Sequence, residues 1–362
     1  MVNYLDSLND EIREFFSILS EDFPEWLLDY INVFEMQRIG KIGMNCGTDY
    51  TALYNNRYFY SNLEHSVGVA LIIWNFTHDK VQTLAGLFHD IATPVFKHCV
   101  DFMNGDSEYQ ESTEEKTEDI ILNSTEIMFL LKRDNINVED IIDYKKYPIA
   151  DNNTPRLAAD RFEYNFSSGL CFKRVWELDK IKKCYDNVII LTNEDGEFEL
   201  GFNDLDVCEE YIETISNLWP EWVTDKNRVT MQFIADIVKS MNVKGYLNID
   251  DLYKLSEKEI IDMIINCDDK NISLAFKKFQ DITESISSDC EINGLYCVSV
   301  NSKKRYIDPL VKTKNGVYRL SKVSKKGKEA INKYFNMKTH QYIALDIDFV
   351  PYEFNKILRK KL

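Results

Sequence analysis

Apolar residues recur at helical spacing through most of the first half of the chain. This periodicity predicts helices over Leu8 to Leu19, Glu25 to Ile42, His65 to Thr77 and Lys80 to Ala92. Thr93-Pro94 should end the last of these, because the residue before a proline is disfavoured in helical geometry. A further short helix, Arg156 to Phe166, is predicted just after Pro155. We therefore expect residues 1–180 to form a helical core.

The pattern changes after residue 180. Asn187 to Thr192 and Phe198 to Phe202 alternate as a β-hairpin would, and short strands are predicted within Gly294 to Ser324 around Asn315-Gly316. Helices fill the interval from about Asp204 to Ser287, one of them starting at a capping box made by Ser256 and Glu259. The basic C-terminal end is also expected to be helical. The fold class is thus mainly α, with residues 181–362 forming an α+β region.

Composition narrows the class of protein. The 362 residues are 44% hydrophobic and 13% aromatic, which favours a globular chain. A net charge of -17 disfavours nucleic acid or an anionic membrane as the main partner. No apolar stretch is long enough to span a membrane, and the N-terminus does not resemble a signal peptide. Eight scattered cysteines without a CxxC pair indicate reduced thiols, so a cytoplasmic location is expected.

Candidate chemistry is concentrated around His89-Asp90. Four of the five histidines fall between residues 65 and 98, and this adjacent His and Asp ends an apolar helical run. A carboxylate is rarely buried unless it is paired or bound to a cation. Imidazole nitrogen and carboxylate oxygen together suit divalent Mn, Fe, Ni, Co or Zn better than Mg alone. Taken singly, His89-Asp90 could instead be a capped helix end, and Asp160 a surface carboxylate.

Three short motifs resemble those of a known family. His65-Ser-Val-Gly-Val, Leu87-Phe-His-Asp-Ile91 and Ala159-Asp-Arg-Phe-Glu-Tyr164 resemble, in order and spacing, the metal-binding motifs of the HD-domain phosphohydrolases. The nearest branch contains the deoxynucleoside triphosphate triphosphohydrolases. The resemblance runs from about Met36 to Phe166 and continues weakly into Arg305 to Pro309. It implies an all-helical core, frequent self-association into homo-oligomers, and one metal held by His65, His89, Asp90 and Asp160.

The same resemblance implies roles for several neighbours. His98 occupies the position of a histidine that faces substrate phosphate, and Asp101 that of an acid which orients a catalytic histidine. Tyr164, four residues after Asp160 and hence on the same helix face, matches a tyrosine that contacts the nucleotide. Arg161 and Arg38 match basic positions assigned to substrate binding. From the residues alone, Tyr164 could be a core aromatic and the two arginines could form structural ion pairs.

The chain also departs from the triphosphohydrolase pattern. Thr93 and Glu114 replace two family histidines, Met44 replaces a glutamine that reads the sugar, and Ser167-Ser168 replaces Arg-Asp. The metal ligands are therefore retained while the readers of triphosphate and sugar are largely gone. Glu111 and Glu114 are candidates for a general base or for holding a second cation. The alternative is that this acidic segment is a solvated loop.

These observations favour a metal-dependent phosphohydrolase that hydrolyses a nucleotide or another small phosphate ester by attack of metal-activated water. Two further hypotheses stay open. One is a catalytically silent nucleotide-binding or sensor module that keeps the metal. The other is a deoxynucleoside triphosphate triphosphohydrolase of altered specificity, which the motif order and Tyr164 support.

Overall fold

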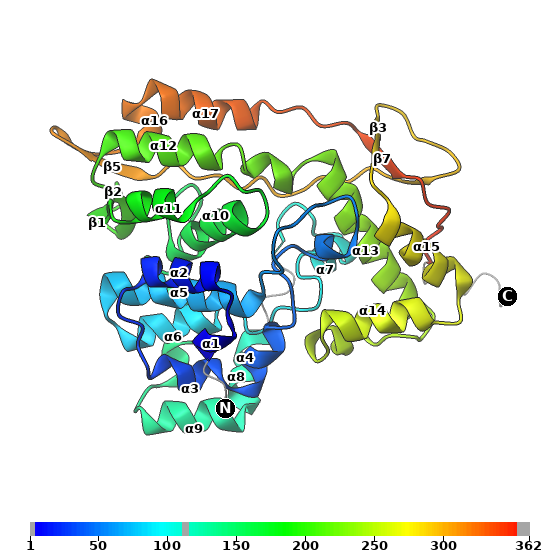
Figure 1. Ribbon diagram of the computed structural model, residues 1–362, viewed down its shortest axis with the longest axis horizontal. Coiled ribbons are helices and arrows are strands. Elements are labelled where there is room, and N and C mark those ends of the chain that lie inside the picture. Colours follow the sequence, from blue (N-terminus) through cyan, green and yellow to red (C-terminus); the bar gives the residue numbers. More distant parts are fainter. Residues whose placement is uncertain (1–3, 111–115, 353–362) are drawn as a thin grey trace.

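Helices make up most of the computed structural model, which describes residues 4–110 and 116–352 (Figure 1). The first ten α-helices are α1 (Tyr4–Ser7), α2 (Asp10–Leu19), α3 (Leu27–Ile31), α4 (Phe34–Ile39), α5 (Asn62–Thr77), α6 (Lys80–Phe88), α7 (Cys99–Met103), α8 (Thr117–Asn123), α9 (Thr125–Arg133) and α10 (Ala159–Cys171). They are followed by α11 (Leu178–Tyr185), α12 (Leu205–Ile215), α13 (Asp225–Val243), α14 (Glu257–Asn266), α15 (Lys270–Asp281), α16 (Leu320–Val323) and α17 (Lys325–Phe335). The predicted fold class, mainly α, is confirmed.

The strands form two small sheets in the C-terminal half. They are β1 (Val188–Thr192), β2 (Phe198–Phe202), β3 (Ile286–Ser288), β4 (Tyr296–Val298), β5 (Leu310–Thr313), β6 (Gly316–Arg319) and β7 (Tyr342–Leu345). The first sheet has the order β1-β2-β5-β6, with β2 and β5 parallel, and the second has the order β3-β7-β4. The predicted hairpin at residues 187–202 is confirmed, and so are the short strands predicted around Asn315-Gly316, which pair with each other as β5 and β6. An extended segment, residues 299–309, joins β4 to β5 and crosses the molecule (Figure 1).

Helix α5 lies at the centre of the N-terminal half and determines how α6 and α10 approach. Its start is fixed by a capping box between Ser61 and Glu64, and nearly all of its first three turns are buried. A Cβ atom on Gly86 of α6 would lie 2.2 Å from Ile73, and one on Gly68 of α5 would lie 2.8 Å from Glu163 of α10. Glycine at these two positions therefore lets three helices pack closely enough to share one site.

Two predicted helices have different bounds in the structure. Residues 25–42, predicted as one helix, form α3 and α4, because Val33 is extended with φ -65° and ψ 151°. The side chain of Gln37 donates to the Ile31 carbonyl over 2.8 Å, which satisfies an acceptor that the interrupted helix leaves open. The helix predicted from Arg156 begins instead at Ala159 and continues to Cys171. Asp160 therefore lies in the first helical turn.

Of the remaining predictions for the C-terminal half, one is confirmed, one is corrected and two are not tested by the structure. The capping box of Ser256 and Glu259 at the start of α14 is confirmed. The helices predicted up to Ser287 end at Asp281, and the following residues enter β3. The predicted boundary near residue 180 stays a prediction; across it, the hydroxyl of Tyr185 donates to the Leu19 carbonyl at 2.6 Å. The basic end, Lys356 to Lys361, lies outside the described residues.

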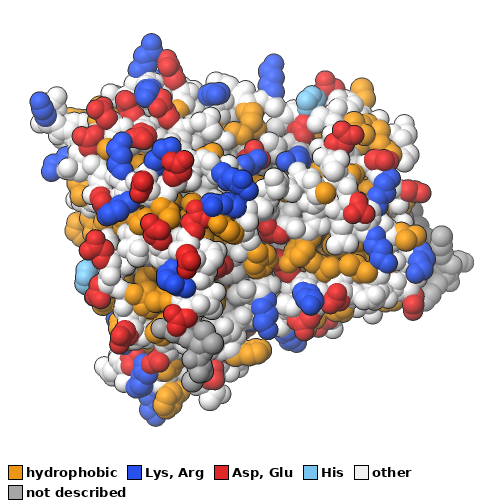
Figure 2. All heavy atoms as spheres, viewed as in Figure 1, with side chains coloured by type: hydrophobic (Ala, Val, Ile, Leu, Met, Phe, Trp, Pro, Cys, Tyr) orange, Lys and Arg blue, Asp and Glu red, His pale blue; other side chains and the backbone are white. Residues whose placement is uncertain are grey.

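The surface carries both signs of charge. Figure 2 shows acidic and basic side chains interspersed over one face rather than separated into large fields. Within residues 4–110 and 116–352, no helix combines the length and the apolar composition that crossing a bilayer would require.

Candidate metal centre

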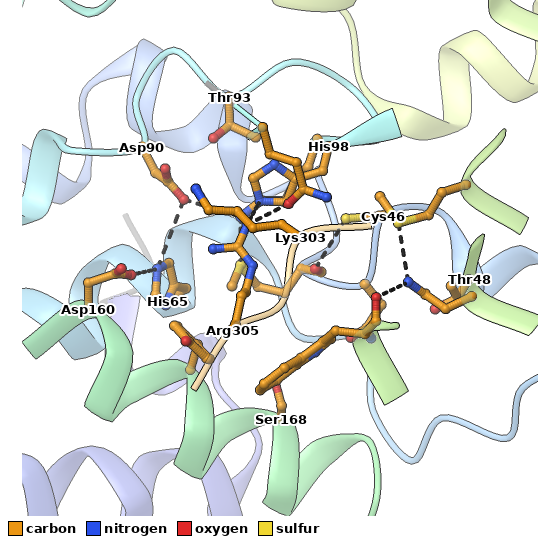
Figure 3. Close-up of a pocket in the computed structure, with 18 of the residues that line it drawn as sticks. Cys46, Thr48, His65, Asp90, Thr93, His98, Asp160, Ser168, Lys303 and Arg305 are labelled. Atoms are coloured by element: carbon orange, nitrogen blue, oxygen red, sulfur yellow. Dashed lines mark hydrogen bonds and ion pairs between the residues drawn. The ribbon is translucent and has the colours of Figure 1, made fainter. Parts of the chain in front are cut away.

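The four predicted metal ligands converge in one cavity (Figure 3). His65, His89 and Asp160 each offer a ligand atom, and these atoms lie within 4.8 Å of one another. Asp160 Oδ1 is 3.2 Å from His65 Nε2 and 3.7 Å from His89 Nε2. Asp90 Oδ2 is 3.9 Å and 3.7 Å from the same two nitrogens. The separations among His65, His89 and Asp160 fit one shared divalent ion, because ligand atoms about 2.0–2.2 Å from a metal lie roughly 3–4 Å apart. Asp90 lies close to both imidazoles but outside this group of three, so its part as fourth ligand stays a prediction.

Local structure explains why the four side chains meet. His65 projects from the first turn of buried α5, and Asp160 from the first turn of α10, which packs against α5. Helix α6 ends at Phe88, so His89 and Asp90 lie in the turn that follows rather than inside the predicted helix. The turn lets both adjacent side chains face the same point, whereas consecutive residues of a helix diverge around its axis.

Neighbouring groups orient both imidazoles as Nε2 ligands. His89 Nδ1 lies 2.7 Å from the Gly86 carbonyl, which can only accept, so Nδ1 carries the proton. His65 Nδ1 contacts the carboxylate of Glu163. Glu163 is itself buried and accepts from the Tyr60 hydroxyl at 2.7 Å and from Ser167 at 3.2 Å. Such outer contacts fix ring orientation and strengthen the ligand, as is typical of metal-binding histidines.

The electrostatics of the cluster also favour a cation. Burial raises the pKa of Asp90, but the Lys97 ammonium and the two imidazoles outweigh it and hold that pKa well below its usual range. Burial likewise raises the pKa of Asp160, and His65 more than reverses the effect. Burial lowers the pKa of His65, whereas Glu163 and Asp160 raise it to about 9. The carboxylates are thus ionised at neutral pH, and a binding metal would displace a proton from His65.

The cavity has a volume of about 220 Å³ and a mixed lining. The polar residues that line it with the metal cluster include His98, Lys97, Lys303 and Arg305. Tyr164, Trp222, Phe172 and Met231 add aromatic and apolar surface. The rings of Tyr164 and Trp222 meet edge to face at 5.3 Å, and burial is the main cause that raises the pKa of Tyr164 to about 12. A ligand with one anionic end and one apolar end fits this arrangement.

His98 and Asp101 form a connected pair at the edge of the cavity. His98 lines the cavity just before α7, and its Nδ1 lies 2.9 Å from Asp101 Oδ2. Asp101 is fully buried behind the ring. Burial and the nearby Arg305 guanidinium together lower the pKa of His98, although Asp101 opposes them. The imidazole is therefore neutral at pH 7 and available to accept a proton or a hydrogen bond.

The two arginines predicted to bind substrate do not line the cavity. The guanidinium of Arg38 is buried and donates to the carbonyls of Ile91 and Thr93 at 2.9 Å and 2.8 Å. It therefore braces the turn that follows His89-Asp90, and burial lowers its pKa to about 10. Arg161 pairs with Asp151 at 3.0 Å and donates to the Arg156 carbonyl at 2.8 Å. Arg161 thus forms the ion pair that the alternative interpretation expected, whereas the partners of Arg38 are backbone carbonyls rather than an acid.

Among the residues that differ from the family pattern, some line the cavity and one lies outside the described residues. Thr93, Met44 and Ser168 line the cavity, so the replaced groups are ones that a ligand would meet. Glu111 and Glu114, the predicted general base or second-cation ligands, lie outside the described residues. The roles of all predicted site residues stay predictions, because proximity alone does not establish them.

Sequence reasoning missed several residues that shape the cavity. Lys97 Nζ lies 3.1 Å from Asp90 Oδ2 and also donates to the amide oxygen of Asn62. Arg305 and Lys303 reach the same space from the 299–309 segment (Figure 3). Glu163 was detectable, because it follows Asp160 by three residues and so shares its helix face. Arg305 begins the segment into which the family resemblance weakly continues, but no role followed from it, and Lys303 carried no such signal.

Comparisons with known proteins give distant relatives. No family model matches the chain. The uncharacterized protein YdhJ of Bacillus subtilis is 22% identical over 262 residues, covering 72% of this chain and 76% of its own length. The metal-dependent phosphohydrolase cns2 of Cordyceps militaris is 20% identical over 297 residues, covering 78% and 79%.

Solved structures share the fold across most of the chain. A phosphohydrolase from Bacteroides thetaiotaomicron matches with a TM-score of 0.62 at 14% identity, covering 91% of this chain and 97% of its own. A hypothetical protein from Aquifex aeolicus matches with a TM-score of 0.57 at 16% identity, covering 93% and 95%. At these identities the similarity establishes the fold, and the activity has to be argued from the site.

Proposed function

We propose that this chain is a metal-dependent phosphohydrolase of the HD type that cleaves a small phosphate ester. The observation that carries the proposal is one cavity with His65, His89, Asp90 and Asp160 on one side and an array of cationic side chains beside them. The similar proteins cns2 and the Bacteroides structure are both named phosphohydrolases, which supports the same reaction class. The donor set favours Mn, Fe, Ni, Co or Zn over Mg alone.

A divalent ion bound there would lower the pKa of a coordinated water and polarise a phosphoryl oxygen. The protein's own residues supply the rest. Lys97 and Arg305 would bind the remaining phosphoryl oxygens through charge-assisted hydrogen bonds. His98, neutral and backed by Asp101, is placed to accept a proton or a hydrogen bond at the cavity edge. The apolar wall around Tyr164 and Trp222 would hold the leaving group.

Phosphate release from a panel of nucleoside monophosphates, nucleoside triphosphates and simple phosphate esters tests the proposal. The assay is run with Mn²⁺, Ni²⁺, Mg²⁺ and no added metal, beside Asp90→Ala and the exposed control Asp250→Ala. We expect one substrate class to be turned over by the wild type and by Asp250→Ala. Asp90→Ala should lose at least about 100-fold, since loss of a direct ligand exceeds the roughly 10–100-fold cost of losing an outer contact.

The panel also separates the alternatives. Preference for triphosphates would favour the triphosphohydrolase of altered specificity. Silence across the panel, from protein shown to contain its metal, would favour a binding module. A thermal shift with nucleotides would then identify its ligand, because a ligand of the folded state raises the unfolding temperature.

A further inference from the structure

Arg305 links the C-terminal half of the chain to the candidate active site. It lies on the extended segment between β4 and β5, and its guanidinium enters the cavity between His65 and His98 (Figure 3). Its Nη2 lies 2.7 Å from the Gln110 side-chain oxygen and 3.2 Å from His98 Nε2. Lys303, two residues earlier, donates to the Tyr109 carbonyl at 2.6 Å. These hydrogen bonds hold residues 303–305 of the 299–309 segment against the edge of the cavity.

The contact with His98 determines which ring nitrogen carries a proton. A guanidinium has donors and no acceptor, so His98 Nε2 must accept the hydrogen bond. The proton of the neutral ring then lies on Nδ1, which donates to Asp101 at 2.9 Å. Arg305 thus donates to His98, and His98 in turn donates to Asp101. The Nε2 lone pair is turned toward the cavity.

The described residues that line the cavity are balanced in charge. Its lining includes three carboxylates, on Asp90, Asp160 and Glu221, and three cations, on Lys97, Lys303 and Arg305. A divalent ion at the metal cluster would leave an excess of two positive charges. A phosphate monoester carries about -1.5 to -2 at pH 7, which matches that excess. A triphosphate carries more negative charge than this cavity compensates.

From this geometry we infer that Arg305 is a substrate-binding residue that grips the phosphoryl group of a phosphate monoester dianion and holds His98 Nε2 as an acceptor. The inference rests on the proposed function and names its substrate class. Only Nη2 of Arg305 is hydrogen-bonded to the described part of the chain, so Nε and Nη1 can bind oxygens of the ligand. Nε–H and Nη1–H point away from different edges of the guanidinium, so each can donate to a separate oxygen of the ligand in a fixed direction, whereas an ammonium offers its donors from a single nitrogen.

Titration calorimetry with inorganic phosphate measures the contribution of Arg305 to phosphate affinity in the absence of turnover. Metal-loaded wild type is compared with Arg305→Gln, Arg305→Lys and the control Lys304→Gln, whose side chain lies outside the cavity. We expect Arg305→Gln to weaken phosphate binding about 10- to 100-fold, as loss of a hydrogen bond to a charged group does. Arg305→Lys should weaken it less, and Lys304→Gln by under about 2-fold. Equal affinity in Arg305→Gln and wild type, or an equal loss in Lys304→Gln, would overturn the inference.

The tautomer of His98 gives a second readout that needs neither metal nor substrate. Ring ¹⁵N spectra of the metal-free protein are assigned with His98→Asn, which is practical with five histidines. Wild type should show an unprotonated Nε2 and a protonated Nδ1, and Arg305→Gln should alter the Nε2 signal. Arg305→Lys serves if the glutamine variant does not fold. An unchanged Nε2 signal in both variants would overturn the positioning role.

These measurements distinguish two failures. If phosphate binding depends on Arg305 but no ester is hydrolysed, the proposed function fails while the anion site stands. If esters are hydrolysed but Arg305→Gln binds phosphate normally, the inference fails while the proposed function stands. Turnover of a nucleoside triphosphate with a kcat/KM at least equal to that of its monophosphate would overturn the assignment to a monoester dianion.

Discussion

Two pairs of carboxylates near this cavity, of which Glu257 is buried and the other three are half-buried, have pKa values shifted in opposite directions. Asp90 and Asp160 have pKa values well below the usual range. Burial instead raises the pKa of Asp49 and, more strongly, that of Glu257, to about 8. Both members of the second pair face Gly43, since a Cβ there would lie 3.1 Å from Asp49 Oδ2 and 3.4 Å from Glu257 Oε2.

The neighbours account for the difference. Asp90 has the Lys97 ammonium 3.1 Å away and two imidazoles close by. The recorded donors to Asp49 and Glu257 are neutral: the amides of Asn45 and Asn56 and the hydroxyl of Tyr50. One oxygen of each acid in this second pair has no hydrogen-bond partner among the described residues. A buried carboxylate stays ionised where cations surround it and takes up a proton where they do not.

The largest effect should come from removing the negative charge of Asp160, one of the candidate metal ligands. The same change at Asp49, in the second pair, is the control. Asp160→Asn should lose at least about 100-fold in metal affinity, because an amide is a poor substitute for a carboxylate ligand. Asp49→Asn should bind metal as the wild type does. Metal content after dialysis, measured by mass spectrometry, checks both. Equal metal retention in the two variants would show that Asp160 is not a ligand.

Glu163→Gln tests the contact behind His65. The amide keeps the shape of the side chain but removes the negative charge that supports the imidazole. We expect about a 10–100-fold loss in metal affinity, as is typical when an outer hydrogen bond to a ligand is disturbed. Competition with a metal-binding dye measures it. Glu257→Gln, at another fully buried glutamate whose carboxylate bonds to Tyr50, is the control, and an equal loss there would exclude a specific role.

Glu257 should make stability depend on pH. Its folded-state pKa of about 8 exceeds the ordinary 4.5, so the folded protein holds a proton that the unfolded chain releases. The stabilisation is complete below about pH 4.5 and is lost as pH rises through 8, at no more than about 1.4 kcal/mol per pH unit. Urea unfolding from pH 5 to 9 should show this slope in wild type and a shallower one in Glu257→Gln. Parallel curves would mean that Glu257 is ionised when folded.

The smallest effect is expected from Tyr50→Phe. This change removes the 2.7 Å hydrogen bond to Glu257 and leaves the ring in place. The free energy of unfolding should fall by about 1 kcal/mol near pH 6. Metal affinity should not change, because the removed hydroxyl bonds to Glu257 and not to a candidate metal ligand. A loss of metal in this variant would show that the two pairs are coupled.

Much of the fold follows from local sequence patterns. Apolar periodicity located α2, α5 and α6, and alternation located the hairpin at residues 187–202. The motifs containing His65, His89-Asp90 and Asp160 were recognisable because each is short and contiguous. The split between α3 and α4 was not predicted, since Val33 belongs to an apolar pattern that continues through it. Periodicity records which side of a segment is apolar and does not record a local change of backbone direction.

The sequence by itself determined the helical core, the candidate metal ligands and the positions where family residues are replaced. Only the tertiary structure decided that Arg38 and Arg161 brace the backbone outside the cavity, and that Arg305 meets His98 across 207 positions of sequence. It also decided which buried acids are ionised. The physical reason is that helical and strand periods relate residues a few positions apart, whereas charge neighbours and cavity walls depend on how distant segments pack.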